Sequence, residues 1–446
     1  MAGGLSPAAQ LEESRAAGVG CLACLGRRTL SRIVWTNGGQ QRSWSSEYFL
    51  HSRCEWEPQQ LFAPILRRGL ARCPGRLVGV AVDDTRLRKT GRLIRQAFYQ
   101  RDPLSPPFHV NLMLGLRFLQ ASLLVLLYRP AAVSTRAVPI AFEEVSPVKR
   151  PKRRASLEQW WQYRQAVKQH NLSQSFVRMM GTLRRQLDQA GGMTKILVVA
   201  GDGSFANRTC FAAQVERTEL IARTRKDAVL CFHAGAGSQR FYAPHKFTPE
   251  QVRQDEASSW TVAKCFYGGK RRKLRYKSLG PVYWQGGARR RPLRLLVVAP
   301  TPYRKRLSGR LYYRQPAYLL TTDLASPARQ LLQIYLDRWQ IEVNHRDEKD
   351  TLGVGQAQLW NPTAVPKQPA LTVAAYSALL LASLEAFGAE RGRAYAPLPR
   401  WRRKAKRPSC LDLITLLRQE MVEHPELLAP LDLSLTDRSL TSAAAA

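Results

Sequence analysis

Two apolar runs that each end in aspartate constrain the fold of this chain more than any other feature. RLVGVAVDDT spans residues 76–85 and ends in Asp83 and Asp84, and KILVVAGDGS spans residues 195–204 and reaches Asp202. Continuous apolar runs of this length, without polar alternation, are typical of strands that are buried on both faces of a sheet. The sequence therefore predicts an α/β fold with acids at the carboxyl ends of two central strands.

The rest of the chain is organised around these two strands. Short helical patterns come first, and a Ser156/Gln159 capping pair opens one long or two short helices that stop at Gly191 and Gly192. Short β-like runs separated by Gly, Pro and Arg follow the second strand. We expect an N-terminal helical region (1–76), a core in two parts (77–205 and 318–365), a β-rich cationic insertion (206–317) and a C-terminal helical region (366–446).

The charge balance points to a polyanionic ligand. The chain has 446 residues, with 69 Lys and Arg against 33 Asp and Glu, a formal net charge of +36. Because 45% of the residues are hydrophobic, a packed core is expected and a disordered basic tail is excluded. A small acidic metabolite would not require such an excess, so the expected ligand is nucleic acid. Runs of cations occur along the chain, at 149–154, 270–277, 289–294, 304–310 and 400–407.

The cysteines and the apolar stretches favour a reduced, cytoplasmic protein. Eight cysteines are too few for a disulfide framework, and the first residues lack the pattern of a signal peptide. Cys21 and Cys24 have the spacing of half a zinc site, but small buried side chains are the preferred interpretation. The stretch 110–128 contains Arg117 and Gln120, which favours two adjacent strands, or a strand and a helix, over a membrane span.

A helix predicted to end at Gly353 carries four reactive side chains. At about 100° per residue, Tyr335, Arg338, Glu342 and Lys349 fall within an arc of roughly 60°. One helix face would then present a carboxylate beside two cations and a phenol. An ordinary ion pair on a solvated helix is the alternative interpretation.

Glu342 gains significance from the two strand-end acids. Three carboxylates, two at strand ends and one on a later helix, can bind two Mg²⁺ ions, which prefer oxygen ligands. Two such ions about 4 Å apart can activate the attacking oxygen and stabilise the leaving oxygen of a phosphodiester. The cations Arg338 and Lys349 would hold the phosphates of the strand being cut.

Three sequence blocks together resemble the DDE transposases of bacterial insertion sequences. YLDRWQIEVNHRDEK (335–349) matches the signature Y-(2)-R-(3)-E-(6)-K of one group of these enzymes. VAVDDTRLRKTGR (80–92) resembles their first-aspartate region, and VVAGDGSFANR (198–208) resembles the second. The resemblance covers roughly residues 76–360.

The resemblance implies a fold, an activity and a set of site residues. It implies a ribonuclease-H-like core in which Asp84, Asp202 and Glu342 bind Mg²⁺, with Mn²⁺ as a possible substitute. Homodimers of such enzymes act on double-stranded DNA, cutting paired transposon ends and joining them to target DNA. By motif, Tyr335, Arg338 and Lys349 would contact phosphates near the cleaved end. Trp339 would stack a flipped base, as in some relatives, unless it is a core aromatic.

The sequence leaves four questions open. Successive strand residues point to opposite faces, so Asp83 and Asp84 cannot both reach one metal pair, and the family pattern favours Asp84 because it precedes threonine. A two-metal nuclease that does not rejoin DNA would share the site. A catalytically inactive DNA-binding or regulatory protein derived from a transposase would share the charge. The role of residues 1–76 in recognising transposon ends rests on analogy alone.

Overall fold

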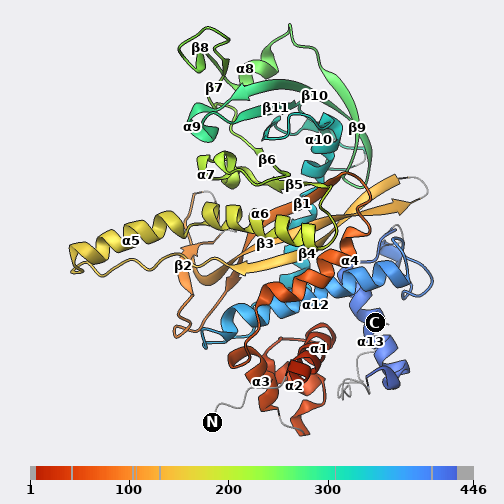
Figure 1. The fold of residues 1–446 in the computed structure, drawn as a ribbon. Helices are drawn as coiled ribbons and strands as arrows, with labels where there is room; N and C mark the ends of the chain where they lie inside the picture. The colour runs from red at the N-terminus through yellow and green to blue at the C-terminus, as the bar shows by residue number, and fades with distance from the viewer. Residues whose placement is uncertain are drawn as a thin grey trace.

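The computed structural model describes residues 7–41, 44–102, 105–106, 108–129, 132–306, 308–402 and 405–428. Within these residues the chain is a mixed α/β protein with helices packed around one large sheet (Figure 1), which confirms the predicted fold class. The twelve described strands of this sheet follow the order β2-β3-β1-β5-β6-β14-β11-β10-β7-β8, with β4 beside β3 and β9 beside β10.

Helices from both ends of the chain gather at one end of the molecule, the lower end in Figure 1. The N-terminal helices are α1 (Pro7–Ala23), α2 (Leu30–Thr36), α3 (Ser45–Ser52) and α4 (Ala63–Leu70), and the C-terminal ones are α12 (Ala364–Ala386) and α13 (Cys410–Glu423). α12 packs against α1, α4 and β4. Among the described helices it alone is long and apolar enough to cross a membrane, and two thirds of its most apolar window is buried inside the protein.

The cysteines are buried side chains, as the preferred interpretation held. All eight, including Cys21 and Cys24, are free and buried. No group of His, Cys, Asp or Glu side chains among the described residues is arranged to hold a metal ion, so Cys21 and Cys24 lack further zinc ligands.

β1 (Leu77–Arg88) lies at the centre of the core and contains the first apolar run. It pairs in parallel with β5 (Ile196–Gly201) on one side and antiparallel with β3 (Leu112–Arg129) on the other. Its apolar residues from Val78 to Val82 are buried, whereas Asp83 and Asp84 are half-buried. Both predicted buried strands are therefore confirmed, and β5 ends directly before Asp202 as predicted. The prediction that β1 ends at its aspartates was wrong, because its pairing with β3 continues through Asp83 and Asp84 to Arg88.

The apolar stretch 110–128 forms one strand rather than two elements. The single glycine of this stretch, Gly115, does not start a turn. It pairs with Arg88 of β1, so β3 continues without a break. β3 also pairs antiparallel with β4 (Ala132–Glu144) and with the short edge strand β2 (Phe98–Arg101). The expectation of two elements here was wrong.

Two helices connect β4 to β5, one of the two arrangements expected. The capping pair is present: Ser156 accepts a hydrogen bond from the Gln159 backbone, and Gln159 accepts one from the Ser156 backbone, at the start of α5 (Leu157–Gln169). α5 extends away from the body in Figure 1, and none of its residues is buried. α6 (Leu172–Gln189) packs against β3, and Gly191 follows its end with φ = 89°.

The insertion begins later than predicted. β6 (Thr218–Arg223) lies inside the expected insertion but pairs in parallel with β5, so it belongs to the central sheet. Its apolar run LIA is short and is followed by cations, which gave it the appearance of an insertion strand. The added strands are β7 (Leu230–His233), β8 (Tyr242–Phe247), β9 (Thr261–Tyr267), β10 (Lys270–Tyr283), β11 (Pro292–Val298), β12 (Pro302–Arg304) and β13 (Leu311–Tyr313).

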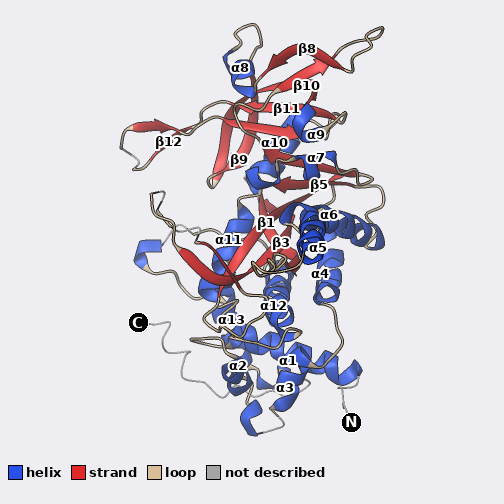
Figure 2. Ribbon diagram, turned by 90° about the vertical axis from the view of Figure 1, so that its left-hand side faces the viewer, coloured by secondary structure: helices blue, strands red, loops and turns tan. Residues whose placement is uncertain are grey.

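Three short helices accompany these strands, and the chain then returns to the core. The helices are α7 (Arg208–Ala212), α8 (Pro249–Gln254) and α9 (Gln285–Ala288). β14 (Ala317–Thr321) pairs antiparallel with both β6 and β11, so the insertion extends the central sheet. In Figure 2 the insertion occupies the upper part of the molecule and the terminal helices the lower part.

The predicted single helix ending at Gly353 is divided into three segments. α10 (Ala328–Asp337) is followed by a turn at 338–339, then by α11 (Gln340–Arg346) and a π-helical turn, Asp347–Thr351. Gly353 follows with φ = 59°, which confirms the predicted stop. Because a π turn advances more slowly around the axis than an α turn, the regular spacing assumed for residues 335–349 does not reach Lys349.

Candidate active site

The strand register brings Asp83 level with Asp202. In the parallel pair of β1 and β5, Ala81 lies opposite Ala200. Asp83, within β1, and Asp202, directly after the end of β5, each follow two residues later, so they lie at the same level of the sheet. Carboxyl ends of neighbouring parallel strands are where α/β proteins commonly place functional groups.

Both aspartates also lie on the face of the sheet that α10 and α11 cover. Ala81 packs in one buried cluster with Ile341 of α11, and Ala200 packs in another with residues of α10. Gly79 permits this close approach, since a Cβ there would lie 3.2 Å from the Ile334 side chain. Because alternate strand residues share a face, Asp83 follows Gly79 and Ala81 toward these helices.

Arg338 lies between Asp83 and Glu342. Its Nη1 is 3.6 Å from Asp83 Oδ2, and its Nη2 is 3.5 Å from Glu342 Oε1. The guanidinium is largely buried, and within the described residues its Nε and Nη1 donate no hydrogen bond. A buried guanidinium with unused N–H groups can donate hydrogen bonds to a further anionic oxygen.

The carboxylates influence one another. Burial, followed by the charge of Asp202, raises the pKa of Asp83 to about 7, while Arg338 opposes the shift. Burial also raises the pKa of Glu342, Arg338 lowers it, and Asp202 raises it further. The charge of Asp202 therefore acts on both other acids. Asp202 itself accepts hydrogen bonds from the backbone N (2.9 Å) and hydroxyl (2.5 Å) of Ser204.

Asp84 points to different partners. Its Oδ2 accepts a hydrogen bond of 2.8 Å from Nε of Arg117 on β3. Asp84 lies on the same face of β1 as Val80 and Val82, and these two valines belong to the buried cluster that includes Phe176 of α6. The structure thus brings Asp83, rather than the Asp84 favoured by the family pattern, to Arg338 and to the charge of Asp202.

The other signature residues are only partly gathered. The Arg338 guanidinium carbon lies 5.8 Å from the centre of the Tyr335 ring, and burial raises the pKa of Tyr335. Lys349 makes no ion pair with Glu342 within the described part of the chain. Burial lowers the pKa of Lys349, and the neighbouring charges that act on it include Arg86 and Asp84.

Trp339 is exposed beside the site. Its relative exposure of 60% excludes the core-aromatic interpretation. It occupies the turn between α10 and α11, directly after Arg338. An exposed ring at this position is available for contact with a ligand.

Two supporting contacts were not foreseen in the sequence. Glu348, fully buried in the π-helical turn, accepts a hydrogen bond of 2.9 Å from Gln120, which lies opposite Asp83 on β3. Lys89 donates to the backbone carbonyls of Gly355 and Ala357 at 2.8 and 2.7 Å. The contact joins the buried Lys89 to the loop after Gly353, more than 260 residues along the chain, so no local sequence pattern predicts it.

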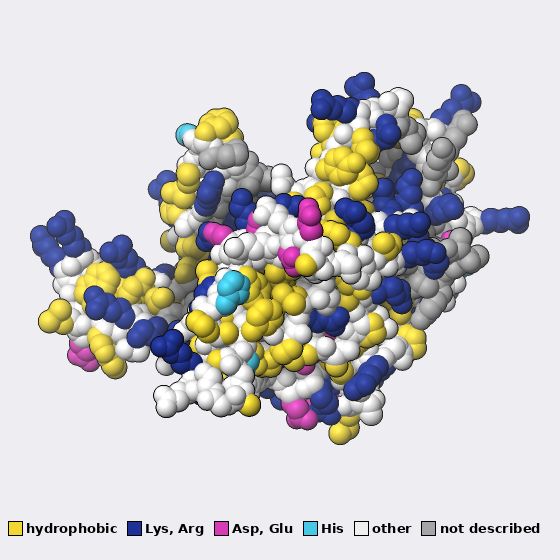
Figure 3. All heavy atoms as spheres, turned by 90° about the horizontal axis from the view of Figure 1, so that it is seen from above, with side chains coloured by type: hydrophobic (Ala, Val, Ile, Leu, Met, Phe, Trp, Pro, Cys, Tyr) yellow, Lys and Arg dark blue, Asp and Glu magenta, His cyan; other side chains and the backbone are white. Residues whose placement is uncertain are grey.

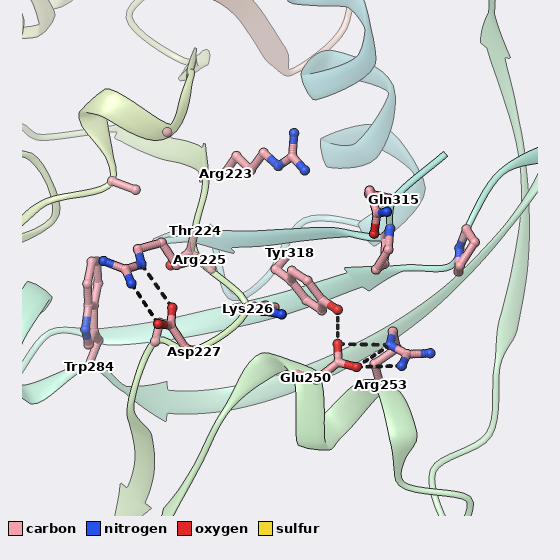
Figure 4. Close-up of a pocket in the computed structure, with 15 residues that line it drawn as sticks. Arg223, Thr224, Arg225, Lys226, Asp227, Glu250, Arg253, Trp284, Gln315 and Tyr318 are labelled. Atoms are coloured by element: carbon pink, nitrogen blue, oxygen red, sulfur yellow. Dashed lines mark hydrogen bonds and ion pairs between the residues drawn. The ribbon is translucent and has the colours of Figure 1, made fainter. Parts of the chain in front are cut away.

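A cationic cavity of about 1030 Å³ adjoins Asp202. Its wall begins at Gly203 and includes the ring of Trp284 together with cations from the end of β6 and from α8 (Figure 4). Arg225 pairs with Asp227, and Glu250 pairs with Arg253 and Tyr318, whereas Arg223 points toward the neighbouring helix. The cations are Arg223, Arg225, Lys226 and Arg253. Arg223, Arg225 and Lys226 belong to the run LIARTRK, which carries no signal that they border Asp202.

The insertion end of the molecule is strongly cationic. Seen from above, Lys and Arg side chains are spread over the face in Figure 3, and acidic side chains occupy only a few places. On β10, Lys270, Arg271, Lys273 and Arg275 are exposed. Such a surface attracts a polyanion over a wide area.

The donor chemistry of the site fits a hard divalent cation, although Arg338 lies between two of the acids. Asp83, Asp202 and Glu342 offer only carboxylate oxygens, and the charge of Asp202 raises the pKa of both other acids. No three His, Cys, Asp or Glu side chains among the described residues are arranged to hold an ion. Binding therefore requires the Arg338 guanidinium to move off the two carboxylates.

No protein-family model matches this chain, and a comparison with curated proteins finds no match. The function must therefore be inferred from the site itself.

Proposed function

We propose that this protein is a DDE-type DNA transposase that cleaves transposon ends and joins them to target DNA. One observation supports this proposal most strongly. Asp83 in β1 and Asp202 just after β5 lie at one level of two adjacent parallel strands, on the face covered by α11, which carries Glu342. Three carboxylates from three separate elements meet the requirement of two-metal phosphodiester chemistry.

The topology supports a ribonuclease-H-like core. β4, β3 and β1 are antiparallel neighbours, and β5 and β6 follow in parallel with β1. The insertion leaves after β6 and returns at β14, before the helix with the glutamate. This arrangement agrees with the order Asp, Asp, insertion, Glu that the three sequence blocks imply.

Asp83, Asp202 and Glu342 would hold the metal ions, which supply an activated attacking oxygen and a stabilised leaving oxygen when bound. This assignment replaces Asp84 by Asp83. Asp84, paired with Arg117, would instead fix the outer part of β1 against β3. The predicted cofactor remains Mg²⁺, with Mn²⁺ as a substitute.

Arg338 would bind the phosphate of the cut strand. Its Nε and Nη1 have no hydrogen-bond acceptor among the described residues, and a phosphate can accept two donors from one guanidinium. When the guanidinium turns to the phosphate, Asp83 and Glu342 become free for cations. Tyr335 and the exposed Trp339 would contact the same strand, and Lys349 would act farther along it, beside Arg86.

The DNA ligand and the oligomeric state are parts of the same proposal. The net charge of +36 and the cationic insertion favour double-stranded DNA, at transposon ends and target. Joining two ends requires two sites, so we propose a homodimer on paired ends, measurable as the mass of the protein–DNA complex.

A strand-transfer assay tests the function. The full chain is incubated with Mg²⁺, a target plasmid and duplexes taken from the DNA that flanks its coding region. We expect cleaved ends and joined products. Glu342→Gln should lose both products and retain binding in a gel-shift assay, because the amide keeps the size of the carboxylate but is a poorer ligand.

Other outcomes contradict the proposal in distinct ways. Cleavage without joined products identifies the two-metal nuclease. Binding without cleavage, in Mg²⁺ and in Mn²⁺, identifies the inactive DNA-binding protein. Equal activity of Glu342→Gln and the unchanged protein removes the carboxylate site from the mechanism.

A further inference from the structure

The hairpin of β12 and β13 has no packing partner within the described residues. These two strands form a separate sheet of their own and do not join the large one. From Pro302 to Gln315 no described residue is buried, and Leu311 and Tyr313 are 40% and 62% exposed. An isolated two-stranded hairpin is only marginally stable in water, so an exposed one of this kind is expected to bind a partner.

The hairpin chemistry specifies an anionic partner. Residues 300–316 contain five cations and no acid. Two cations lie over tyrosine rings of the hairpin, Lys305 at 5.2 Å from the Tyr312 centroid and Arg314 at 5.5 Å from that of Tyr303. These contacts leave the positive charge on the outside of the hairpin, where it faces solvent.

Duplex DNA fits the hairpin better than a single strand does. Single-strand binding depends on free aromatic rings on which bases stack. Here Tyr303 and Tyr312 lie against each other, with centroids 5.6 Å apart, so only Tyr313 is free for stacking. A two-stranded β-ribbon has a width that the major groove of B-DNA accepts.

The hairpin also starts beside the candidate site. Pro300, Gln315 and Pro316, which flank it, line the cavity whose wall begins at Gly203, next to Asp202. In Figure 2, β12 extends from the insertion toward the side of the molecule where α11 lies. Duplex DNA with a phosphate at Asp202 can therefore continue along the cavity to the hairpin.

We propose that the β12–β13 hairpin is a DNA-binding ribbon that enters the major groove of the duplex next to the cleaved end. This inference rests on the proposed function for the identity of the polyanion. It adds a binding surface outside the signature blocks. The ribbon contributes affinity and footprint length, and the carboxylate site contributes cleavage.

A triple substitution in the full chain tests the ribbon. Lys305→Gln, Arg306→Gln and Arg310→Gln together remove three exposed charges and leave the bond from Arg304 Nη1 to the Gly309 carbonyl (2.6 Å) that closes the hairpin. The matched control removes three exposed charges from the loop before α5, at Lys152, Arg153 and Arg154. Both variants have the same net charge and leave the core intact.

The probe is a duplex of flanking DNA treated with dimethyl sulfate, which methylates guanine N7 in the major groove and adenine N3 in the minor groove. Each phosphate contact contributes about −0.9 to the slope of log K against log salt, so the ribbon variant should reduce the steepness by up to about 2.7 and weaken binding at least about tenfold. In the ribbon variant, methylation of guanine N7 beside the cleaved end should no longer interfere with binding. The control should keep this interference.

Three results overturn the ribbon. The first is that both variants weaken DNA binding equally and leave the methylation interference unchanged. The second is that only methylation of adenine N3 interferes with binding. The third is that the ribbon variant loses more affinity for single strands than for duplex DNA. Suppose that the unchanged protein binds the duplex but never cleaves it, and that the interference is lost in the ribbon variant. The ribbon then stands and the proposed enzyme fails. If it cleaves and the ribbon variant matches the control, only the ribbon fails.

Discussion

β1 and β10 are long strands of the same sheet, but their side chains are distributed differently. β1 is covered on both faces between Val78 and Val82, so its charged residues occur only beyond that segment. β10 has only Leu274, Lys277 and Val282 buried, and cations line the rest of its first half. Coverage on both faces keeps carboxylates out of the buried segment of a strand, whereas one open face permits a cationic surface. The core thus positions the acids, and the insertion supplies a cationic surface.

The largest expected difference between the two regions is in stability. Phe118 of β3 is fully buried and stacks on Phe142, with ring centroids 4.5 Å apart. Phe118→Ala should lower the free energy of unfolding by about 3–5 kcal/mol, through lost burial and a cavity. Phe232→Ala in the insertion, where the ring is 39% exposed, should cost about 1 kcal/mol or less. Denaturant unfolding followed by circular dichroism measures both, and equal losses would contradict this division.

A second prediction concerns pH and compares Glu348 of the core with Glu250 of the insertion. Burial raises the pKa of Glu348 to about 8, and its hydrogen bond to Gln120 opposes the shift. Between the unfolded pKa of about 4.3 and the folded value, the folded state holds a proton that the unfolded state has released. Stability should therefore fall by up to about 1.4 kcal/mol for each unit of rising pH in this window.

Glu348→Gln should make the fall in stability between pH 5 and pH 8 less steep, because a glutamine does not titrate and can still accept the bond from Gln120. A slope from Asp83 and Asp337 should remain, since burial raises the pKa of each to about 7. Glu250 is the control. The hydrogen bond from Arg253 holds the pKa of Glu250 near 2, so its stabilisation is present above pH 5 and is lost only in acid. Glu250→Gln should leave the slope between pH 5 and pH 8 unchanged. A Glu348→Gln protein with the original slope would show that another group is responsible.

The smallest predicted effect is on the salt dependence of DNA binding. Arg271 on β10 is exposed, and Arg271→Gln should reduce the slope of log K against log salt by about 0.9 if it contacts one phosphate. Arg67 is exposed on α4, at the opposite end of the molecule, and Arg67→Gln should not change the slope. Titrations of duplex DNA at several salt concentrations measure the slope for each variant. A reduced slope for Arg67→Gln and an unchanged slope for Arg271→Gln would place the DNA on the helical end.

Local signals predicted much of the fold. The two buried strands, the capping pair at Ser156 and the stop at Gly353 each depend on a few neighbouring residues, and each is present in the structure. β6 was misassigned because its identity as a core strand comes from its pairing with β5, which no short run encodes. The long strand β3 was divided for the same reason.

The site was less predictable, because it depends on faces and helix phase. Since β1 is buried on both sides, its apolar pattern does not identify the face that α10 and α11 cover. That choice comes from the small side chains of Gly79 and Ala81, which permit close packing with Ile334 and Ile341. The predicted position of Lys349 on the helix face was wrong because Lys349 lies within a π-helical turn, and no residue pattern indicated that turn.

The most direct test compares the two adjacent aspartates of β1 in one assay. Cleavage of duplex end DNA in Mg²⁺ is measured for Asp83→Asn and Asp84→Asn, with end binding measured in parallel. The account predicts that Asp83→Asn retains binding but loses cleavage by about four orders of magnitude, the scale on which loss of one catalytic group acts. Asp84→Asn, which removes the ion pair with Arg117 and the charge that acts on Lys349, should still cleave. An active Asp83→Asn protein beside an inactive Asp84→Asn protein would contradict the assignment of the site to the face that α10 and α11 cover.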